Sequence, residues 1–172
     1  MKSLFLSHYE SPIWKLTLGV IENKLCLLTF DVPKRRDEEI NEVLKYFGAE
    51  IRYENHPLFD ETIRQLHEYF AWKRKNFEIP LLVFGTDFQK KSWQALQTIP
   101  YWATWSYKQE AEKVGSPKAV RAVGSANGRN RIAIIIPCHR VIANSGNLSG
   151  FGWGIEKKKF LLELEGNISN FS

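Results

Sequence analysis

A run of five apolar residues, 132–136, is followed at once by Pro137, Cys138 and His139. A continuous apolar run of this length predicts a buried strand or a short segment of the core. Pro137 must end it, because proline lacks the N–H that continues a hydrogen-bonded ladder and restricts the residue before it. Cys138 is therefore expected at the edge of the core, with a histidine beside it.

A neighbouring cysteine and histidine allow two interpretations. The thiolate is the reactive form of cysteine, and only a few per cent of an ordinary thiol is ionised at pH 7, so a reactive Cys138 would need a base such as His139 nearby. Alternatively, Cys138 is a small buried hydrophobic residue, which is the commoner role of a free cysteine. The pair alone does not decide between them.

The chain has 172 residues, 44% of them hydrophobic, so it can form one large domain or two small ones. Its formal net charge of +5 favours an anionic partner without establishing nucleic-acid binding. Two cysteines form no disulfide framework and no apolar signal segment opens the chain, so we expect the cytoplasm, or the nucleus of a eukaryote. No apolar run approaches the roughly 18 residues of a membrane span, so we expect no membrane insertion.

The first half of the chain predicts an α+β arrangement, a small antiparallel sheet followed by helices. The expected strands are residues 4–6, 14–21 and 25–30, and the expected helices are residues 37–47 and a segment capped by Asp60 that ends near residue 72. A change of composition near residues 79–87 predicts an N-terminal domain over 1–84, a C-terminal domain over 85–168 and a tail over 169–172.

No metal site is predicted. Cys26 has apolar neighbours in an expected strand, which indicates a structural role. His8, His56 and His67 are scattered, and together with Cys26 they match none of the ligand spacings of zinc sites.

The second half contains two capping boxes, the pattern in which Ser or Thr is followed three residues later by Glu or Gln at a helix start. One joins Thr86 to Gln89, and its helix should end before Pro100. The other joins Ser106 to Gln109.

A tight turn follows the second of these helices. Gly115 should stop it, and Ser116 with Pro117 should begin another helix that runs to residue 126. Helix, glycine turn and helix form the outline of a helix-turn-helix. The last helix combines small residues with one prominent cation, Arg121, which suits close approach to a groove and insertion better than reading of base edges. The same outline also occurs in ordinary helical domains.

Residues 136–142, Ile-Pro-Cys-His-Arg-Val-Ile, resemble the active-site signature of the O6-alkylguanine-DNA alkyltransferases, the methylated-DNA:protein-cysteine methyltransferases. The resemblance is strong over residues 84–166 and general over the first 80 or so. It also includes Ser106-Tyr107, residues 116–124, Asn130, residues 150–154 and residues 161–165. It implies a ribonuclease-H-like N-terminal domain and a mostly helical, winged-helix-like C-terminal domain.

The resemblance further implies a single-turnover DNA repair enzyme, in which Cys138 takes the alkyl group of O6-alkylguanine irreversibly and without a cofactor, with O4-alkylthymine left open as a second substrate. Glu165 would orient His139, and His139 would deprotonate Cys138 through a water molecule. Tyr107 would donate a proton or hydrogen bond to the departing guanine, and Asn130 would brace the active-site loop.

The resemblance also implies DNA and substrate contacts. A monomer would bind double-stranded DNA through the minor groove and flip the damaged nucleotide out, while Arg121 fills the gap. Further DNA contacts are expected from Tyr107, Lys108, Ser116, Gln89 and Asn144, and the base pocket would include Phe151, Gly152 and Trp153.

Two other classes remain as alternatives. A non-catalytic damage-binding protein would keep Tyr107 and Arg121 but lack a nucleophilic cysteine, so Cys138 argues against it. A Cys-His-Glu hydrolase could use the same three residue types but would leave Arg121 unexplained.

Two charged features have ordinary interpretations. The run of three lysines over residues 157–159 is expected to be a solvated helix face. Arg140 could neutralise a phosphate or form a structural ion pair.

Overall fold

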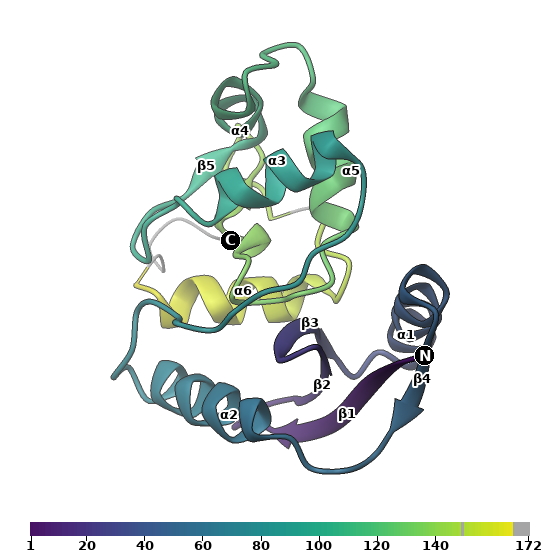
Figure 1. The fold of residues 1–172 in the computed structure, drawn as a ribbon. Coiled ribbons are helices and arrows are strands. Elements are labelled where there is room, and N and C mark those ends of the chain that lie inside the picture. Colours follow the sequence, from purple (N-terminus) through teal and green to yellow (C-terminus); the bar gives the residue numbers. More distant parts are fainter. Residues whose placement is uncertain (149, 167–172) are drawn as a thin grey trace. The chain divides into compact units, whose positions relative to one another are not determined.

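The computed structural model describes residues 1–148 and 150–166 (Figure 1). The chain forms two compact units, residues 1–83 and the residues from Phe84 onward. The predicted tail over 169–172 lies outside the described residues. Within the described ranges, no helix combines the length and the apolar character needed to cross a bilayer.

The N-terminal unit contains a four-stranded sheet in the order β3-β2-β1-β4. Strands β1 and β2 pair antiparallel, as do β2 and β3, whereas β4 is parallel to β1. The predicted α+β architecture is confirmed, but β4 was not predicted, because only four residues form it. The strands are β1 Lys2–Glu10, β2 Lys15–Ile21, β3 Lys24–Phe30 and β4 Ala49–Arg52.

The hairpin between β2 and β3 turns on Glu22 and Asn23, which have φ of 50° and 61°. Two consecutive residues with positive φ form the turn that matches the twist of a β-hairpin. The hairpin places Cys26 in the core, where its thiol donates to the Gly19 carbonyl oxygen at 3.4 Å. Burial raises the pKa of Cys26 to about 12, consistent with its predicted structural role.

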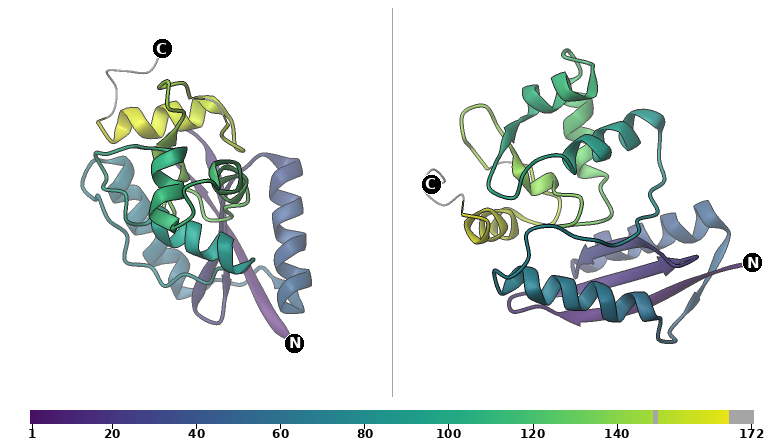
Figure 2. Two further views of the ribbon diagram at one scale, coloured as in Figure 1. Left: turned by 90° about the horizontal axis from the view of Figure 1, so that it is seen from above. Right: turned by 60° about the vertical axis from the view of Figure 1, so that its left-hand side comes forward.

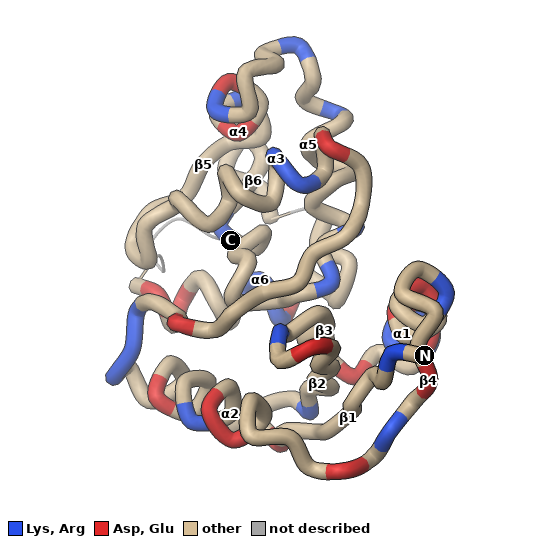
Figure 3. The backbone as a smooth tube through the Cα atoms, in the orientation of Figure 1, with Lys and Arg blue, Asp and Glu red and all other residues tan. Residues whose placement is uncertain are grey.

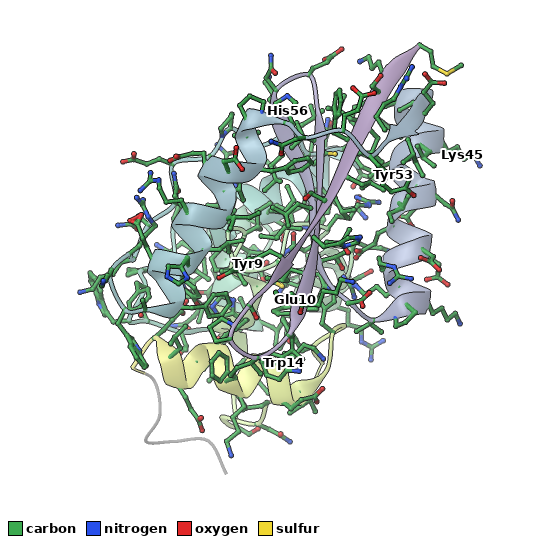
Figure 4. The ribbon with its side chains drawn as sticks, turned by 90° about the horizontal axis from the view of Figure 1, so that it is seen from below. Tyr9, Glu10, Trp14, Lys45, Tyr53 and His56 are labelled. Atoms are coloured by element: carbon green, nitrogen blue, oxygen red, sulfur yellow. The ribbon has the colours of Figure 1, made fainter. Side chains whose placement is uncertain are left out.

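Two helices complete this unit. Helix α1 (Pro33–Phe47) joins β3 to β4 and packs against both, and helix α2 (Pro57–Phe70) packs against β2. Helix α1 begins earlier than predicted, with Pro33 in its first turn. The predicted cap at Asp60 is wrong. His56 caps α2, because its ring Nδ1 accepts from the Leu58 N–H at 3.1 Å (Figure 4).

The C-terminal unit is mainly helical. Helices α3 (Asp87–Leu96), α4 (Tyr107–Val114) and α5 (Val120–Gly128) pack against one another, and α6 (Ile155–Leu164) lies outside this group in both views of Figure 2. A short parallel pair, β5 (Trp105–Ser106) with β6 (Val141–Ile142), packs against α4. A single 3-10 turn, η1 (Cys138–Arg140), precedes β6.

Both predicted capping boxes are confirmed. The side chains of Thr86 and Ser106 accept from the backbone N–H groups of Gln89 and Gln109, and the side chains of these glutamines accept from the backbone N–H groups of Thr86 and Ser106. Gly115 ends α4 with φ of 84°, as expected.

The start of α5 was predicted wrongly. The helix begins at Val120, after a turn through Pro117, and its N-cap Ala119 offers no capping side chain. Val120 was expected to pack inward but is 38% exposed, whereas Val123 is buried. The buried face of α5 is therefore formed by Val123, Ala126 and Asn127, beyond the first residue of the helix.

Of the two forms expected for residues 132–136, a buried strand or a short segment of the core, the structure has the second. Ile132 is an isolated bridge residue, residues 133–135 form a turn and Ile136 lies in a bend, with Ile134 at φ of 70°. Four of the five residues are buried and Ile135 is partly exposed, and two backbone hydrogen bonds lie within the run, from Ile135 N to Ala133 O at 2.7 Å and from Ile136 N to Ile132 O at 3.2 Å. A β-branched residue at positive φ is strained, so the surrounding contacts must hold it there.

Gly115→Ala should lower the free energy of unfolding by about 1 kcal/mol, because alanine is strained in the left-handed region that this helix end requires. The measurement is denaturant unfolding followed by circular dichroism. Gly128→Ala is the matched control, since Gly128 ends α5 without positive φ and a Cβ there would meet nothing within 4 Å. Equal losses in the two variants would contradict the role of Gly115.

Candidate active site

The reactive centre is built around Cys138, which opens the η1 turn and is 6% exposed. The amide of Asn130 holds this turn. Its Nδ2 donates to the Ile136 carbonyl oxygen at 2.9 Å and contacts the Cys138 sulfur at 3.3 Å, while its Oδ1 accepts from the Ile132 N–H at 3.0 Å. One side chain therefore fixes the strained loop and places a hydrogen-bond donor against the sulfur.

The neighbouring His139 is fully buried and bound to an acid. Its Nε2 lies 2.9 Å from Oε2 of Glu165, at the C-terminal end of α6. Arg140 holds the same carboxylate with two bonds, Nε to Oε1 at 2.8 Å and an η nitrogen to Oε2 at 2.9 Å, and it also donates to the Ile99 carbonyl oxygen at 2.7 Å. The two interpretations left open for Arg140 thus resolve in favour of a structural ion pair.

This arrangement sets the protonation states. Burial opposes ionisation of Glu165, but its bonds with His139 and Arg140 lower the pKa of the carboxyl to about 2. Burial lowers the pKa of His139, so its ring is neutral and donates its Nε2 proton to the carboxylate. Nδ1 of His139 is buried and has no hydrogen-bond partner among the described residues. His139 can therefore accept a proton at Nδ1.

Two further groups interact electrostatically with Cys138. Burial raises the pKa of Tyr107, and the negative charges of Cys138 and Glu110 raise it further, so its phenol keeps its proton. The Tyr107 ring lies beside α5, where a Cβ added at Gly124 would come within 3.8 Å of it. Lys158 on α6 places its ammonium 6.0 Å from the centre of the same ring.

Lys158 and Lys157 correct the expectation of a solvated lysine face. Lys158 is 1% exposed and donates to the Val141 carbonyl oxygen at 2.6 Å, and Lys157 is 8% exposed and donates to the Trp153 carbonyl oxygen at 3.0 Å. Only Lys159 of the three is exposed. Burial lowers the pKa of Lys158 to about 8, and the charge of Cys138 opposes this shift. Sequence reasoning missed Lys158, because a run of lysines gives no sign of which one is buried.

The residues predicted to contact DNA lie mostly at the surface. Arg121 on α5, Lys108 on α4 and Asn144 after β6 are exposed, and Ser116 is partly exposed in the turn between α4 and α5. Gln89 is already engaged, since its Oε1 accepts from the Thr86 N–H at 3.0 Å. Figure 3 shows basic positions on α3 and near the turn between α4 and α5.

The predicted base-pocket residues differ in exposure. Phe151 is partly exposed and Gly152 is exposed, whereas Trp153 is 2% exposed. The rings of Phe151 and Trp153 meet edge to face with centroids 5.2 Å apart. Trp153 therefore supports the loop from within, and a ligand would meet Phe151 first.

Among the described residues, no group of three or more His, Cys, Asp or Glu side chains is arranged to hold a metal ion. The candidate site consists of a thiol, a buried base with its acid, a phenol and an ammonium.

Comparison with known proteins identifies the family of the chain. The family described as "6-O-methylguanine DNA methyltransferase, ribonuclease-like domain" matches residues 4–83, and its DNA binding domain matches residues 87–167. A methylated-DNA–protein-cysteine methyltransferase of Methanosarcina acetivorans is 43% identical over 164 residues, which cover 95% of this chain and 99% of the relative. The chain belongs to the 6-O-methylguanine DNA methyltransferase family.

Solved structures agree with this membership. The O6-methylguanine methyltransferase of Mycobacterium tuberculosis superimposes with a TM-score of 0.79 at 40% identity, covering 98% of this chain and 95% of that one. A structure of the M. tuberculosis protein in complex with DNA matches with a TM-score of 0.80 at 40% identity, covering 97% and 94%. The methyltransferase of Pyrococcus kodakaraensis matches with a TM-score of 0.69 at 25% identity, covering 95% and 99%. The predicted family is thus confirmed.

Lys158→Met should slow the reaction of Cys138 with iodoacetamide at pH 7 by about three- to tenfold, because the variant loses a buried positive charge that favours the thiolate. The measurement is the pseudo-first-order rate of labelling, with Cys138 identified by peptide mapping. Lys159→Met, which removes an exposed charge one residue away, should leave the rate unchanged. Identical rates in the two variants would show that the buried ammonium does not act on the thiol.

Proposed function

We propose that this protein repairs DNA by transferring the alkyl group from O6 of guanine to Cys138, once per protein molecule. The observation that carries the proposal is the grouping of a thiol, a neutral buried base and a protonated phenol in the unit that also carries α5. Asn130 contacts the Cys138 sulfur, and the pair of His139 and Glu165 adjoins it in sequence and structure. Family membership supports the same chemistry.

The transfer is a displacement at the alkyl carbon. His139 takes the thiol proton through a water molecule at its Nδ1, and Glu165 stabilises the charge that forms on the ring. The sulfur then forms a bond to the alkyl carbon while the bond from that carbon to O6 breaks and its electron pair goes to guanine. Tyr107 donates a hydrogen bond or proton to the departing base. The balance needs no cofactor.

The product explains why the protein acts once. A thioether has no good leaving group, unlike the acyl intermediate of a cysteine hydrolase, so neither water nor His139 can regenerate the thiol. The same argument separates this proposal from the hydrolase alternative, in which product is released repeatedly.

Access to O6 requires that the nucleotide leave the duplex, because the target atom lies inside the base stack. We infer that a monomer binds the minor groove of double-stranded DNA through α5, and that Arg121 occupies the space of the flipped base. Arg121 is exposed on a helix with small side chains, including Ala122 and Gly124, so the helix can approach the groove closely. Lys108, Ser116, Gln89 and Asn144 would contact the backbone around it, and Phe151 with Gly152 would receive the base.

Intact-protein mass spectrometry tests the proposal. After incubation with a duplex that contains O6-methylguanine, the protein should gain one methylene, about 14 Da, on Cys138, and the gain should saturate at one per molecule. Cys138→Ser should bind the duplex and gain nothing. Unchanged mass with tight lesion binding would favour a damage-binding protein, and repeated product release would favour a hydrolase.

Arg121→Ala should slow repair of duplex DNA by at least about tenfold and leave the reaction with free O6-methylguanine base within about twofold, because only the duplex needs a flipped state held open. Single-turnover rates on both substrates measure this. Lys118→Ala, which removes an exposed charge just before the same helix, is the control for electrostatic attraction and should act mainly through salt-dependent affinity. Equal slowing of both reactions would contradict insertion of Arg121.

A further inference from the structure

A buried carboxyl group joins the three packed helices of the C-terminal unit. Glu110 on α4 is 0% exposed. Its Oε1 accepts from the Ser92 hydroxyl on α3 at 2.8 Å, and its Oε2 accepts from the Asn127 amide on α5 at 2.8 Å. The next residue, Ala111, belongs to the apolar core of these helices. Such a carboxyl group is costly in an apolar core, which suggests a purpose beyond stability.

The partner on α5 leads directly toward the nucleophile. Asn127 lies near the end of the helix, and its carbonyl oxygen accepts from the Asn130 N–H at 3.2 Å. Asn130 in turn holds the loop and the sulfur of Cys138. A second bond, from the Trp93 indole N–H to the Ala126 carbonyl oxygen at 2.8 Å, fixes the same end of α5.

Glu110 is also tied to the phenol of the site. Tyr107 precedes it by three residues on α4, so the two side chains lie on the same side of the helix. The contacts therefore run from the helix that carries Tyr107, through Glu110, Asn127 and Asn130, to Cys138.

We propose that Glu110 is a positioning residue for alkyl transfer, which through Asn127 and Asn130 sets the placement of the Cys138 sulfur relative to Tyr107, and does so most firmly when its carboxyl group is ionised. This inference rests on the proposed function. It adds a residue that acts through others and touches neither the base nor the alkyl group.

Glu110 changes its ionisation state near neutral pH. Burial raises the pKa of Glu110 to about 7, although the bonds from Ser92 and Asn127 favour the charged form. An ionised carboxylate makes stronger hydrogen bonds than a neutral one. The neutral acid can still bond to Ser92 or to Oδ1 of Asn127, which is buried without another partner among the described residues. Both states are therefore possible in the fold, and they differ in how firmly they hold α5.

The charged groups of the surrounding elements do not obscure this titration. Tyr107 is the group whose pKa responds to Glu110, and it keeps its proton. The described residues of β5 and β6 carry no ionisable side chain. Apart from Tyr107 and Glu110 itself, the ionisable residues of these helices are exposed: Asp87, Lys90 and Lys91 on α3, Lys108, Glu112 and Lys113 on α4, and Arg121 on α5.

The experiment compares single-turnover methyl transfer from an O6-methylguanine duplex in the wild type and in Glu110→Gln between pH 6 and 8.5. Glutamine keeps the size but cannot ionise, and like the neutral acid it accepts at one oxygen and donates from its other terminal atom, to Ser92 Oγ or to Oδ1 of Asn127. The two rates should agree within about twofold at pH 6, and the wild type should be about three- to tenfold faster at pH 8.5. Glu112→Gln, on the exposed side of the same helix, should follow the wild type at every pH.

Melting temperatures separate positioning from a merely structural role. Glutamate in an unfolded chain loses its proton near pH 4.3, whereas Glu110 keeps it to about pH 7, so the native state loses stability across that interval. The melting temperature of Glu110→Gln should therefore exceed that of the wild type by a difference that grows from about pH 4.3 to 7 and stays constant above pH 7. The variant would be the more stable protein and the slower one at pH 8.5.

Three outcomes would overturn the inference: a rate ratio that is flat with pH, a faster Glu110→Gln at pH 8.5, or equal rates in Glu110→Leu and the wild type. Asn127→Leu should abolish the pH-dependent difference between glutamate and glutamine at position 110, because it removes the side-chain bond through which residue 110 acts on the end of α5. If the wild type itself gains no methyl group while iodoacetamide still labels Cys138, the proposed function fails instead.

Discussion

The active site depends on one buried carboxylate. Glu165 ends α6, and the two residues that bind it, His139 and Arg140, belong to the turn that starts with Cys138. Removing a charged group from water is costly, and a buried carboxylate persists only when its partners satisfy it. The two bonds from Arg140 and the bond from His139 do so. They also attach α6 to the turn that starts with Cys138, so the acid bound to His139 is part of the framework that places the thiol.

The same region uses polar groups where a core would ordinarily be apolar. Lys158 and Asn130 are both almost fully buried, and each places a donor or positive charge toward the thiol or its loop. Ile134 adds backbone strain to that loop. These features reduce stability, and their common location at Cys138 indicates that they are maintained for reactivity. Glu110 extends the pattern one layer further, into the helices that carry Tyr107 and Arg121.

Local signals predicted the elements whose ends are defined by neighbouring residues. The capping boxes at Thr86 and Ser106 and the glycine stop at Gly115 work through contacts within four residues, so the sequence pattern suffices. Prediction failed where distant contacts decide. Helix α5 starts after Pro117 instead of at it, and only the tertiary structure shows that the apolar run 132–136 is a core segment held by the Asn130 amide and not a strand.

The sequence by itself determined the α+β class and the capped helices before the signature, because periodicity and capping are local in the chain, and the resemblance of residues 136–142 indicated the family. Only the tertiary structure decided the electrostatics of the site. Arg140 pairs with Glu165 across 25 residues, and Lys158 rather than Lys159 is buried. Burial and ion pairing depend on which surfaces meet in three dimensions, and a charge pattern read along the chain contains no record of that.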